Sequence, residues 1–398
     1  MKSLDTQWYY AEGQEIKGPF TEKQMVALAE QKTLHEATLV MSQGMTEWCL
    51  FNQTDLYRRL QSGNSGDSRS TRSFISSAAE KISEMTGEEG PFSLSMKDMF
   101  ADVFKKHTRA ESERLFIAGT QYTTPEIDEI STDSPRPWLF SRVFLSFLFV
   151  YILLFFCLVI FGNANALPGL VLIGSFAVPF SLVIFFFETN VPRNISLFSV
   201  VEMFFIGGVA ALFVTLLLYS FVHINNLTIF SAIIIGIIEE SGKLLIAAWF
   251  IRQMNTRYIL NGLLIGAVIG AGFASFESAG YALSTFLTNH SDMFFSVIDN
   301  RAWSSIGSHT IWTAIATAGL TIVKKQQPFH FELFKQRQFL QFFAVAVILH
   351  VLWDMPVFAG SSFKLLLLIG SGWLVVFVLM SSGLRQITRI IRKKQGFR

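Results

Sequence analysis

The sequence predicts an α-helical polytopic membrane protein of about eight transmembrane helices, preceded by a small N-terminal α+β domain. Hydrophobic residues make up 51% of its 398 residues and charged residues only 16%, which is too apolar for an ordinary soluble protein. The 41 Phe residues concentrate after residue 138, whereas the earlier part carries charge as a soluble sequence does. The composition therefore divides the chain near Trp138.

Residues 5–60 are expected to form a compact domain on the cytosolic side. Aromatic residues at 8–10 predict a short strand, residues 17–20 predict a turn, and a helix is expected to follow. Thr21 and Gln24 form a capping box at the start of that helix. The first residues lack a basic start followed by an apolar core, so no cleavable signal peptide is expected.

The N-terminal domain also carries a recognisable order of short motifs. W-Y-Y, G-P-F-T, a helix, A-T-L-V and M-T-E-W follow one another and resemble the bacterial GYF-like domains over about 50 residues. The resemblance implies that a cytosolic peptide or protein binds the aromatic surface. For any single one of these aromatic residues, packing in a small core is the simpler role. The candidate partner-binding residues are Trp8, Tyr10, Phe20 and Trp48.

Residues 61–137 are expected to form a flexible linker with amphipathic helices. The stretch 62–73 lacks apolar anchors and is rich in Gly and Ser, which is typical of a flexible linker. From 92 to 117, apolar residues recur at helical spacing among Lys and Asp, which predicts one or two amphipathic helices. Such helices would either lie on the cytosolic membrane surface or pack on the membrane domain.

Residues 138–398 are expected to form the membrane domain. A helix needs about 20 residues to cross the hydrocarbon core, and eight apolar runs have that length. Lys and Arg gather in the loops and ends on one side, whereas the other side holds only Arg301 and Lys364, so both termini are assigned to the cytosol. The predicted spans are approximately 141–162, 167–187, 197–222, 229–250, 259–287, 304–323, 339–359 and 364–384.

Ionisable residues inside the fourth to seventh spans indicate function. Each would cost about 2.5–3.5 kcal/mol or more if it faced lipid. Four consecutive helices avoid that cost when these groups face one another around a polar, partly hydrated centre. The residues concerned are Glu239, Glu240, Lys243, Glu277, His309, His350 and Asp354.

The spacing of these residues suggests how they cooperate. Glu239 and Glu240 precede Lys243 by four and three residues, so all three share a helix face. Two adjacent carboxylates in a medium of low dielectric constant should not ionise equally, so one can act as a base and the other as an acid. Asp354 lies one turn after His350 and can fix the tautomer of that ring.

The fifth and sixth spans carry Glu277 and His309. Glycines recur every four residues from 262 to 270 on the fifth span, which allows close approach of a neighbouring helix. Glu277 continues that stripe and is therefore expected at a helix contact. His309 alone is equally well explained as an interhelical hydrogen-bond link or as a functional group.

The combined pattern on successive spans is more specific than its parts. The order E-E-x-x-K, F-E in a Gly-rich helix, an isolated His and H-x-x-W-D resembles the PrsW family of intramembrane proteases, over about Pro179 to Arg385. The related CAAX proteases carry E-E-x-x-x-R, F-x-x-x-H and H-x-x-x-N motifs. Here Lys243, Glu277 and Asp354 stand in place of the Arg, His and Asn, which favours PrsW and argues against prenylated substrates.

The resemblance implies an intramembrane endopeptidase of the bacterial cytoplasmic membrane that acts on a membrane-anchored protein. Glu239 or Glu240 would activate a water molecule, and a histidine would stabilise the oxyanion or protonate the leaving amine. The candidate catalytic residues are Glu239, Glu240, Glu277, His309 and His350, with Lys243 and Asp354 in supporting roles.

Cofactor use is a separate question. The family is often described as metalloproteases, yet the H-E-x-x-H motif is absent, so a mechanism without a metal is favoured. If zinc is used, His309, His350 and Glu277 are its candidate ligands, contributed by separate helices.

Two other classes of function remain open at this point. Carboxylates and histidines within a membrane also build ion pathways, although no internal repeat typical of transporters stands out. A catalytically silent scaffold that binds client helices is the third possibility. A nucleic-acid binder is excluded, because the folded parts show no clustered basic face.

Overall fold

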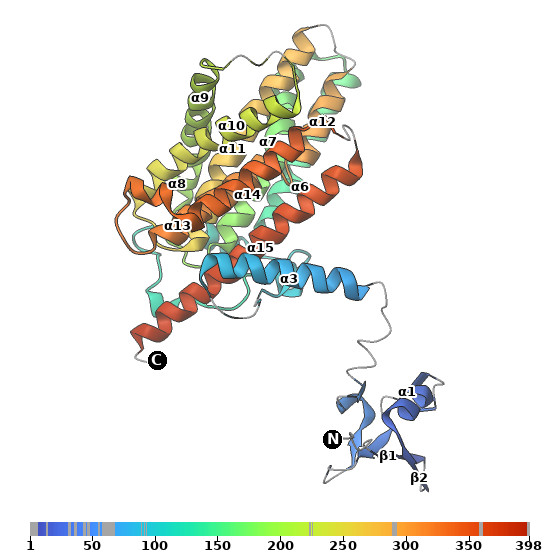
Figure 1. The fold of residues 1–398 in the computed structure, drawn as a ribbon. Helices are drawn as coiled ribbons and strands as arrows, with labels where there is room; N and C mark the ends of the chain where they lie inside the picture. The colour runs from blue at the N-terminus through green and yellow to red at the C-terminus, as the bar shows by residue number, and fades with distance from the viewer. Residues whose placement is uncertain are drawn as a thin grey trace. The chain divides into compact units, whose positions relative to one another are not determined.

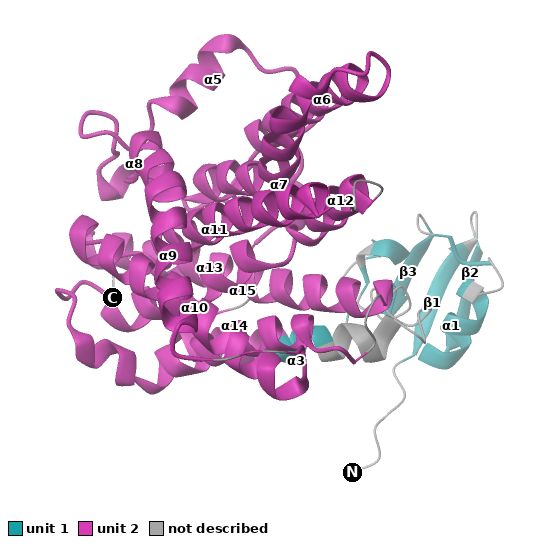
Figure 2. Cartoon of the chain, turned by 90° about the horizontal axis from the view of Figure 1, so that it is seen from above, with its two compact units in different colours: residues 1–78 teal, residues 79–398 magenta. Residues whose placement is uncertain are grey.

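The computed structural model divides the chain into two compact units, residues 1–78 and 79–398 (Figure 2). The residues that the structure describes are 7–12, 15–30, 33–35, 38–42, 45, 48–54, 56–57, 68–88, 90, 92, 94–222, 224, 226–288, 293–357 and 361–395.

The first unit is a small antiparallel sheet with one helix packed on it. The strands run in the order β2-β1-β3-β4 across the sheet. Thr21 and Gln24 form the predicted capping box, with the Thr21 N–H donating to Gln24 Oε1 at 2.9 Å. The predicted turn at residues 17–20 is wrong, because these residues belong to a strand that pairs with the first one. The elements are β1 (Trp8–Glu12), β2 (Glu15–Phe20), α1 (Glu22–Glu30), β3 (Leu39–Ser42) and β4 (Cys49–Leu50).

The segment before the bundle is more ordered than the composition suggests. Helix α3 (Ser68–Thr86) begins inside the stretch that is expected to be a linker, of which residues 62–67 lie outside the described part of the chain. Two short helices, α4 (Met96–Met99) and α5 (Arg109–Phe116), occupy the region of predicted amphipathic helices. Met99 of α4 joins the main core, as do Leu94, Ala118 and Ile130 on either side of these helices, and residues 79–137 belong to the second unit.

The second unit is a bundle of long helices, shown in green to red in Figure 1. A π-helical turn at Met203–Gly207 joins two of them into one continuous segment. Its helices are α6 (Leu139–Val159), α7 (Leu167–Thr189), α8 (Leu197–Glu202), α9 (Gly208–Tyr219), α10 (Ile229–Met254), α11 (Ile259–Leu287), α12 (Phe294–Ser304), α13 (His309–Lys324), α14 (Arg337–Asp354) and α15 (Ser362–Lys394).

The bundle is that of a polytopic membrane protein. Among the described residues, six helical segments are long and apolar enough to cross a membrane. Neither α10 nor α14 is among them, and these two helices carry several of the ionisable residues, so the number of eight spans stays a prediction. The six segments are Leu139–Val159, Ala164–Thr189, Leu197–Tyr219, Ile259–Leu287, Phe294–Lys324 and Ser362–Lys394.

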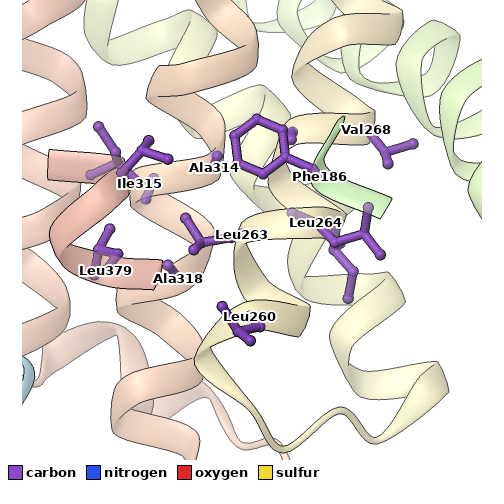
Figure 3. Packing of buried hydrophobic residues seen from close by; sticks show 14 of the residues in the cluster. Phe186, Leu260, Leu263, Leu264, Val268, Ala314, Ile315, Ala318 and Leu379 are labelled. Atoms are coloured by element: carbon purple, nitrogen blue, oxygen red, sulfur yellow. The ribbon is translucent and has the colours of Figure 1, made fainter. Parts of the chain in front are cut away.

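Helix α11 is the centre of the bundle, and it packs most closely against α13. Apolar side chains from both helices interdigitate, as Figure 3 shows for Leu263 of α11 and Ile315 of α13. The glycine stripe makes this approach possible, because a Cβ atom at Gly266 or Gly270 would overlap backbone oxygens of α13. At Gly270 the overlapped atom is the carbonyl oxygen of His309, so the glycine fixes where the first turn of α13 lies.

Candidate functional site

The structure joins all seven ionisable residues singled out by the sequence into one network. They come from α10, α11, α13 and α14, which meet in the interior of the bundle. The network contains the residues Glu239, Glu240, Lys243, Glu277, His309, His350 and Asp354.

Lys243 is the central cation of this network and is fully buried. Its Nζ atom lies 2.8 Å from Glu240 Oε1 and 3.4 Å from Glu239 Oε2, as expected for groups three and four residues apart on one helix. The same atom lies 2.8 Å from Nδ1 of His309 and 4.3 Å from the centre of the Phe273 ring. A buried ammonium needs such partners, because an isolated charge in the interior is strongly destabilising.

In each histidine, one ring nitrogen contacts a carboxylate and the other faces Glu239. His309 Nε2 lies 3.2 Å from Glu277 Oε2, and its Nδ1 lies 3.9 Å from Glu239 Oε2. His350 Nδ1 lies 2.9 Å from Glu240 Oε1, and its Nε2 lies 3.7 Å from Glu239 Oε2. A lysine ammonium can only donate, so Nδ1 of His309 accepts from it and the ring proton is on Nε2.

His350 faces an excess of negative charge. Its Nε2 atom lies between Glu239 and Asp354, whose Oδ2 atom is 3.3 Å away. A neutral ring that donates from Nδ1 would point a lone pair at these two carboxylates. A proton or a cation bound at Nε2 is therefore required to stabilise this arrangement.

Tyr219 is a contact of the site that sequence reasoning missed. It ends α9, and its hydroxyl donates to Glu239 Oε1 at 3.1 Å, so the two oxygens of that carboxylate have different partners. Oε2 faces the histidines while Oε1 is held by the tyrosine. No local motif in the sequence marks Tyr219, because the only other polar side chain of α9 is the hydroxyl of Thr215.

Arg301 is the second residue that the sequence did not assign to the site. It was identified only as a cation on one side of the membrane, but the structure pairs it with Glu277. Its Nε donates to Ser278 Oγ at 2.8 Å, and its guanidinium lies 4.4 Å from the centre of the Tyr281 ring. Arg301 is contributed by α12, a short helix that precedes α13 and that the eight predicted spans did not include.

The histidine rings are also held by an aromatic side chain. Trp312 of α13 stacks on His350 with ring centres 4.4 Å apart and an angle of 26° between the planes. Thr313, its neighbour, donates to Glu240 Oε2 at 3.4 Å. One turn of α13 thus positions both a ring and a carboxylate contributed by other helices.

A cavity of about 610 Å³ opens onto one side of the network. Glu239, both histidines, Glu277 and Asp354 line it, together with serines from the α12–α13 connection. Glu240 and Lys243 do not line the cavity and are fully buried behind it. The two adjacent glutamates are therefore separated by the fold, because only Glu239 can reach a molecule in the cavity.

The residues around the cavity also fit a divalent cation. Glu239, His309 and His350 each offer one ligand atom, and these atoms lie within 4.8 Å of one another. Nδ1 of His309 would exchange its contact with Lys243 for the ion. Two histidines and one carboxylate form a common donor set of catalytic zinc sites. The sequence led us to expect Glu277 as the carboxylate ligand. Glu277 instead contacts Nε2 of His309, the ring nitrogen that faces away from Glu239, so it would orient this histidine as a metal ligand and not bind the metal itself.

The charges of the network are consistent with a bound divalent cation. With both histidines neutral, four carboxylates face two cationic side chains, which leaves two negative charges uncompensated. A divalent cation, or protons on the histidines, would neutralise them. The carboxylates are Glu239, Glu240, Glu277 and Asp354, and the cations are Lys243 and Arg301.

In the first unit, the four aromatic residues singled out for partner binding differ in exposure. Trp8 and Tyr10 are 4% and 5% exposed and belong to the core of the sheet. Phe20 stacks on Tyr10 with ring centres 5.7 Å apart, and it is half-buried, as is Trp48. Core packing accounts for Trp8 and Tyr10. Of the four residues, a ligand could reach only Phe20 and Trp48 without rearrangement of the domain.

Two family models match the chain. Residues 196–382 match the PrsW family of intramembrane metalloproteases, and residues 8–55 match GYF domain 2. The first match contains the whole network and its cavity, and the second contains the small sheet. No curated protein and no solved structure matches the chain.

Proposed function

Residues 196–382 form a PrsW-family intramembrane protease domain, and we propose that it cleaves a membrane-anchored protein by hydrolysis at Glu239. One observation carries this proposal: Glu239 is the carboxylate of the network that both borders the cavity and lies between two histidines. Glu240 holds His350 and Lys243 from behind, so it positions the site and does not touch the substrate.

The reaction follows from these positions. Glu239 accepts a proton from a water molecule in the cavity while the water oxygen bonds to the scissile carbonyl carbon. The Nε2–H of a protonated His350 stabilises the developing oxyanion, after which the carbon–nitrogen bond breaks and the leaving amine takes the proton that Glu239 accepted. No covalent intermediate is needed, because water itself is the nucleophile.

Tyr219 supports this role of Glu239. Its hydroxyl occupies Oε1 and leaves Oε2 directed at the histidines, so a water bound there meets one defined oxygen atom. Preorganised partners of this kind avoid the cost of rearrangement during the reaction.

A metal would be held by Glu239, His309 and His350. When bound, such an ion would lower the pKa of a bound water and polarise the scissile carbonyl. Glu240 and Glu277 would then orient the two rings by accepting from their outer nitrogens.

The substrate and the orientation are part of the proposal. The cavity lies within the bundle of membrane helices, so the cleaved bond belongs to a protein that is anchored in the same membrane. We place both termini in the cytosol of a bacterium and the cavity entrance toward the outer side. Labelling of a cysteine at Ser305, which lines the cavity, tests this, and reaction with cytosolic reagents alone would contradict it.

The GYF domain is proposed to recruit a peptide. Domains of this class bind proline-rich segments, and the half-buried Phe20 and Trp48 are the residues available for such a contact. Titration with a proline-rich peptide should perturb these two residues first, and unchanged signals from both would contradict the assignment.

The test of the function is cleavage of a panel of single-span membrane proteins by the purified chain in liposomes. Cleavage that resists a chelator would support Glu239 acting alone, whereas loss that zinc restores would assign the donor set a metal. Metal content, measured in the wild type and in His350→Ala, distinguishes the two without relying on activity. If the wild type cleaved nothing and instead passed ions, the site would belong to a transporter.

A further inference from the structure

A segment of the second unit outside the protease site carries exposed apolar side chains. Phe104 and Tyr122 are 94% and 93% exposed, and four further large apolar residues of the segment are more than two-fifths exposed. Single exposed apolar residues are normal, but a group within one short segment indicates an interaction surface. The six residues are Met96, Phe100, Phe104, Phe116, Ile117 and Tyr122.

The opposite face of the same segment, residues 94–122, is firmly packed. Leu94, Met99 and Ala118 are 5%, 0% and 7% exposed and belong to the main core of the bundle. Thr108 and Glu111 form a capping box that fixes the start of α5. The exposed side chains therefore project from a surface that the bundle holds in place.

Two contacts locate this segment beside the start of α6. The ring of His107 stacks on Trp138 with centres 3.6 Å apart and an angle of 5° between the planes. The Arg142 guanidinium donates to the backbone oxygen of Lys105 at 2.8 Å. Because α6 begins at Leu139, the segment lies at the level of the first turn of a membrane span.

The outer face of α6 is itself apolar and exposed. Phe144, Leu145 and Leu148 are 37%, 51% and 39% exposed, which in a bilayer means contact with acyl chains. Arg142 extends along this helix toward Lys105, in the way that long basic side chains reach for the interface. In Figure 2, α5 lies at the periphery of the unit.

We propose that residues 94–122 insert into the interface of the membrane leaflet in which α6 begins, with phospholipids as their partner. Phe100 and Phe104 then lie at the boundary between headgroups and acyl chains, where aromatic residues are favoured. The exposed apolar surface of residues 94–122 continues the exposed apolar face of α6, so lipids of one leaflet contact both. The segment carries five basic and four acidic residues, and Lys105 pairs with Asp102, so apolar area and not net charge drives insertion.

The experiment measures the depth of a nitroxide label at Phe104→Cys in phosphatidylcholine vesicles, in a chain with Cys49→Ala and Cys157→Ala. Phe104 is almost fully exposed, so its replacement removes no packing contact. Leu145→Cys supplies the lipid reference, and Glu113→Cys, on the same segment with a side chain 63% exposed, supplies the aqueous reference.

Collisions with oxygen, which partitions into lipid, are compared with collisions with a water-soluble nickel chelate. The ratio is expected to be several-fold higher at 104 and 145 than at 113, and to change little when anionic lipid is added. Equal ratios at 104 and 113 would overturn the insertion. A ratio at 104 that rises only with anionic lipid would overturn its apolar basis.

Discussion

Two charged clusters in the second unit use similar residues and have different consequences. The inner cluster, around Lys243, contains two histidines and borders a cavity. The outer cluster joins Glu88, after α3, to Arg385 and Arg389 of α15. Buried charge therefore does not by itself mark a functional site; here, a titratable ring and access for a substrate distinguish the inner cluster.

The outer cluster is a tether between two elements. Arg385 Nη2 donates to Ser83 Oγ at 2.6 Å, and Arg389 pairs with the Glu88 carboxylate. Burial raises the pKa of the Glu88 carboxyl above its usual value, and Arg389 and Arg385 oppose that rise. The ion pairs thus mainly offset a desolvation cost, and their net contribution to stability should be small.

The largest expected effect is loss of either ring of the inner cluster. His309→Ala and His350→Ala should each lower cleavage by about 10²–10⁴-fold, because His350 donates a proton in the reaction and His309 accepts from Lys243 and lines the cavity. The measurement is the initial rate of substrate cleavage in liposomes. His330→Ala, at an exposed histidine outside the site, is the matched control. Activity retained in His350→Ala would remove that residue from the mechanism.

The buried lysine should matter for folding as well as for activity. Lys243→Met leaves two carboxylates without their cation and should lower the free energy of unfolding by about 3–5 kcal/mol. Adding Glu240→Gln should restore part of that stability, since it removes one unpaired carboxylate and its amide oxygen still accepts from His350. Cleavage should not be restored. Unfolding in mixed micelles measures both variants, and strictly additive losses would show that the two residues do not interact.

A smaller effect on cleavage is expected from loss of the tyrosine that orients Glu239. Tyr219→Phe removes one hydrogen bond to a carboxylate, which is worth about 1.5–3 kcal/mol, and should lower kcat by roughly tenfold or more with KM unchanged. Tyr122→Phe, at an exposed tyrosine, is the control. A change in KM alone would place Tyr219 in substrate binding and not in the orientation of Glu239.

The smallest effect is expected in the outer cluster. Glu88→Gln should change the free energy of unfolding by no more than about 1 kcal/mol, because removing the charge removes the desolvation cost together with the ion pair that offsets it. Cleavage should be unchanged. If Glu88→Gln lowered cleavage as strongly as a histidine substitution, the contrast between the clusters would be wrong.

The composition of the inner cluster was predictable from the sequence. An ionisable residue inside a membrane span is costly, so the residues of α10, α11, α13 and α14 had to face one another. The spacing of Glu239 and Glu240 from Lys243 predicted which face of α10 points inward, and the glycine stripe did the same for α11. Tyr219 and Arg301 could not be found this way, because their contacts depend on the packing of α9 and α12.

Elsewhere, local patterns were overridden by tertiary context. Gly18 and Pro19 are typical of a turn, yet they lie in β2, whose pairing with β1 decides their conformation. Ser68–Ser73 reads as a linker but forms the start of α3. The choice between Glu239 and Glu240 also needed the fold, since only the position of the cavity separates two neighbouring glutamates.

The most direct test of the central claim compares Glu239→Gln with the wild type and Glu88→Gln in the same liposome assay, with new peptide termini identified by mass spectrometry. The wild type and Glu88→Gln should cleave the substrate at the same bond, and Glu239→Gln should be slower by about 10²-fold or more while remaining folded. Cleavage by Glu239→Gln at the wild-type rate would contradict the claim that this carboxylate activates the water.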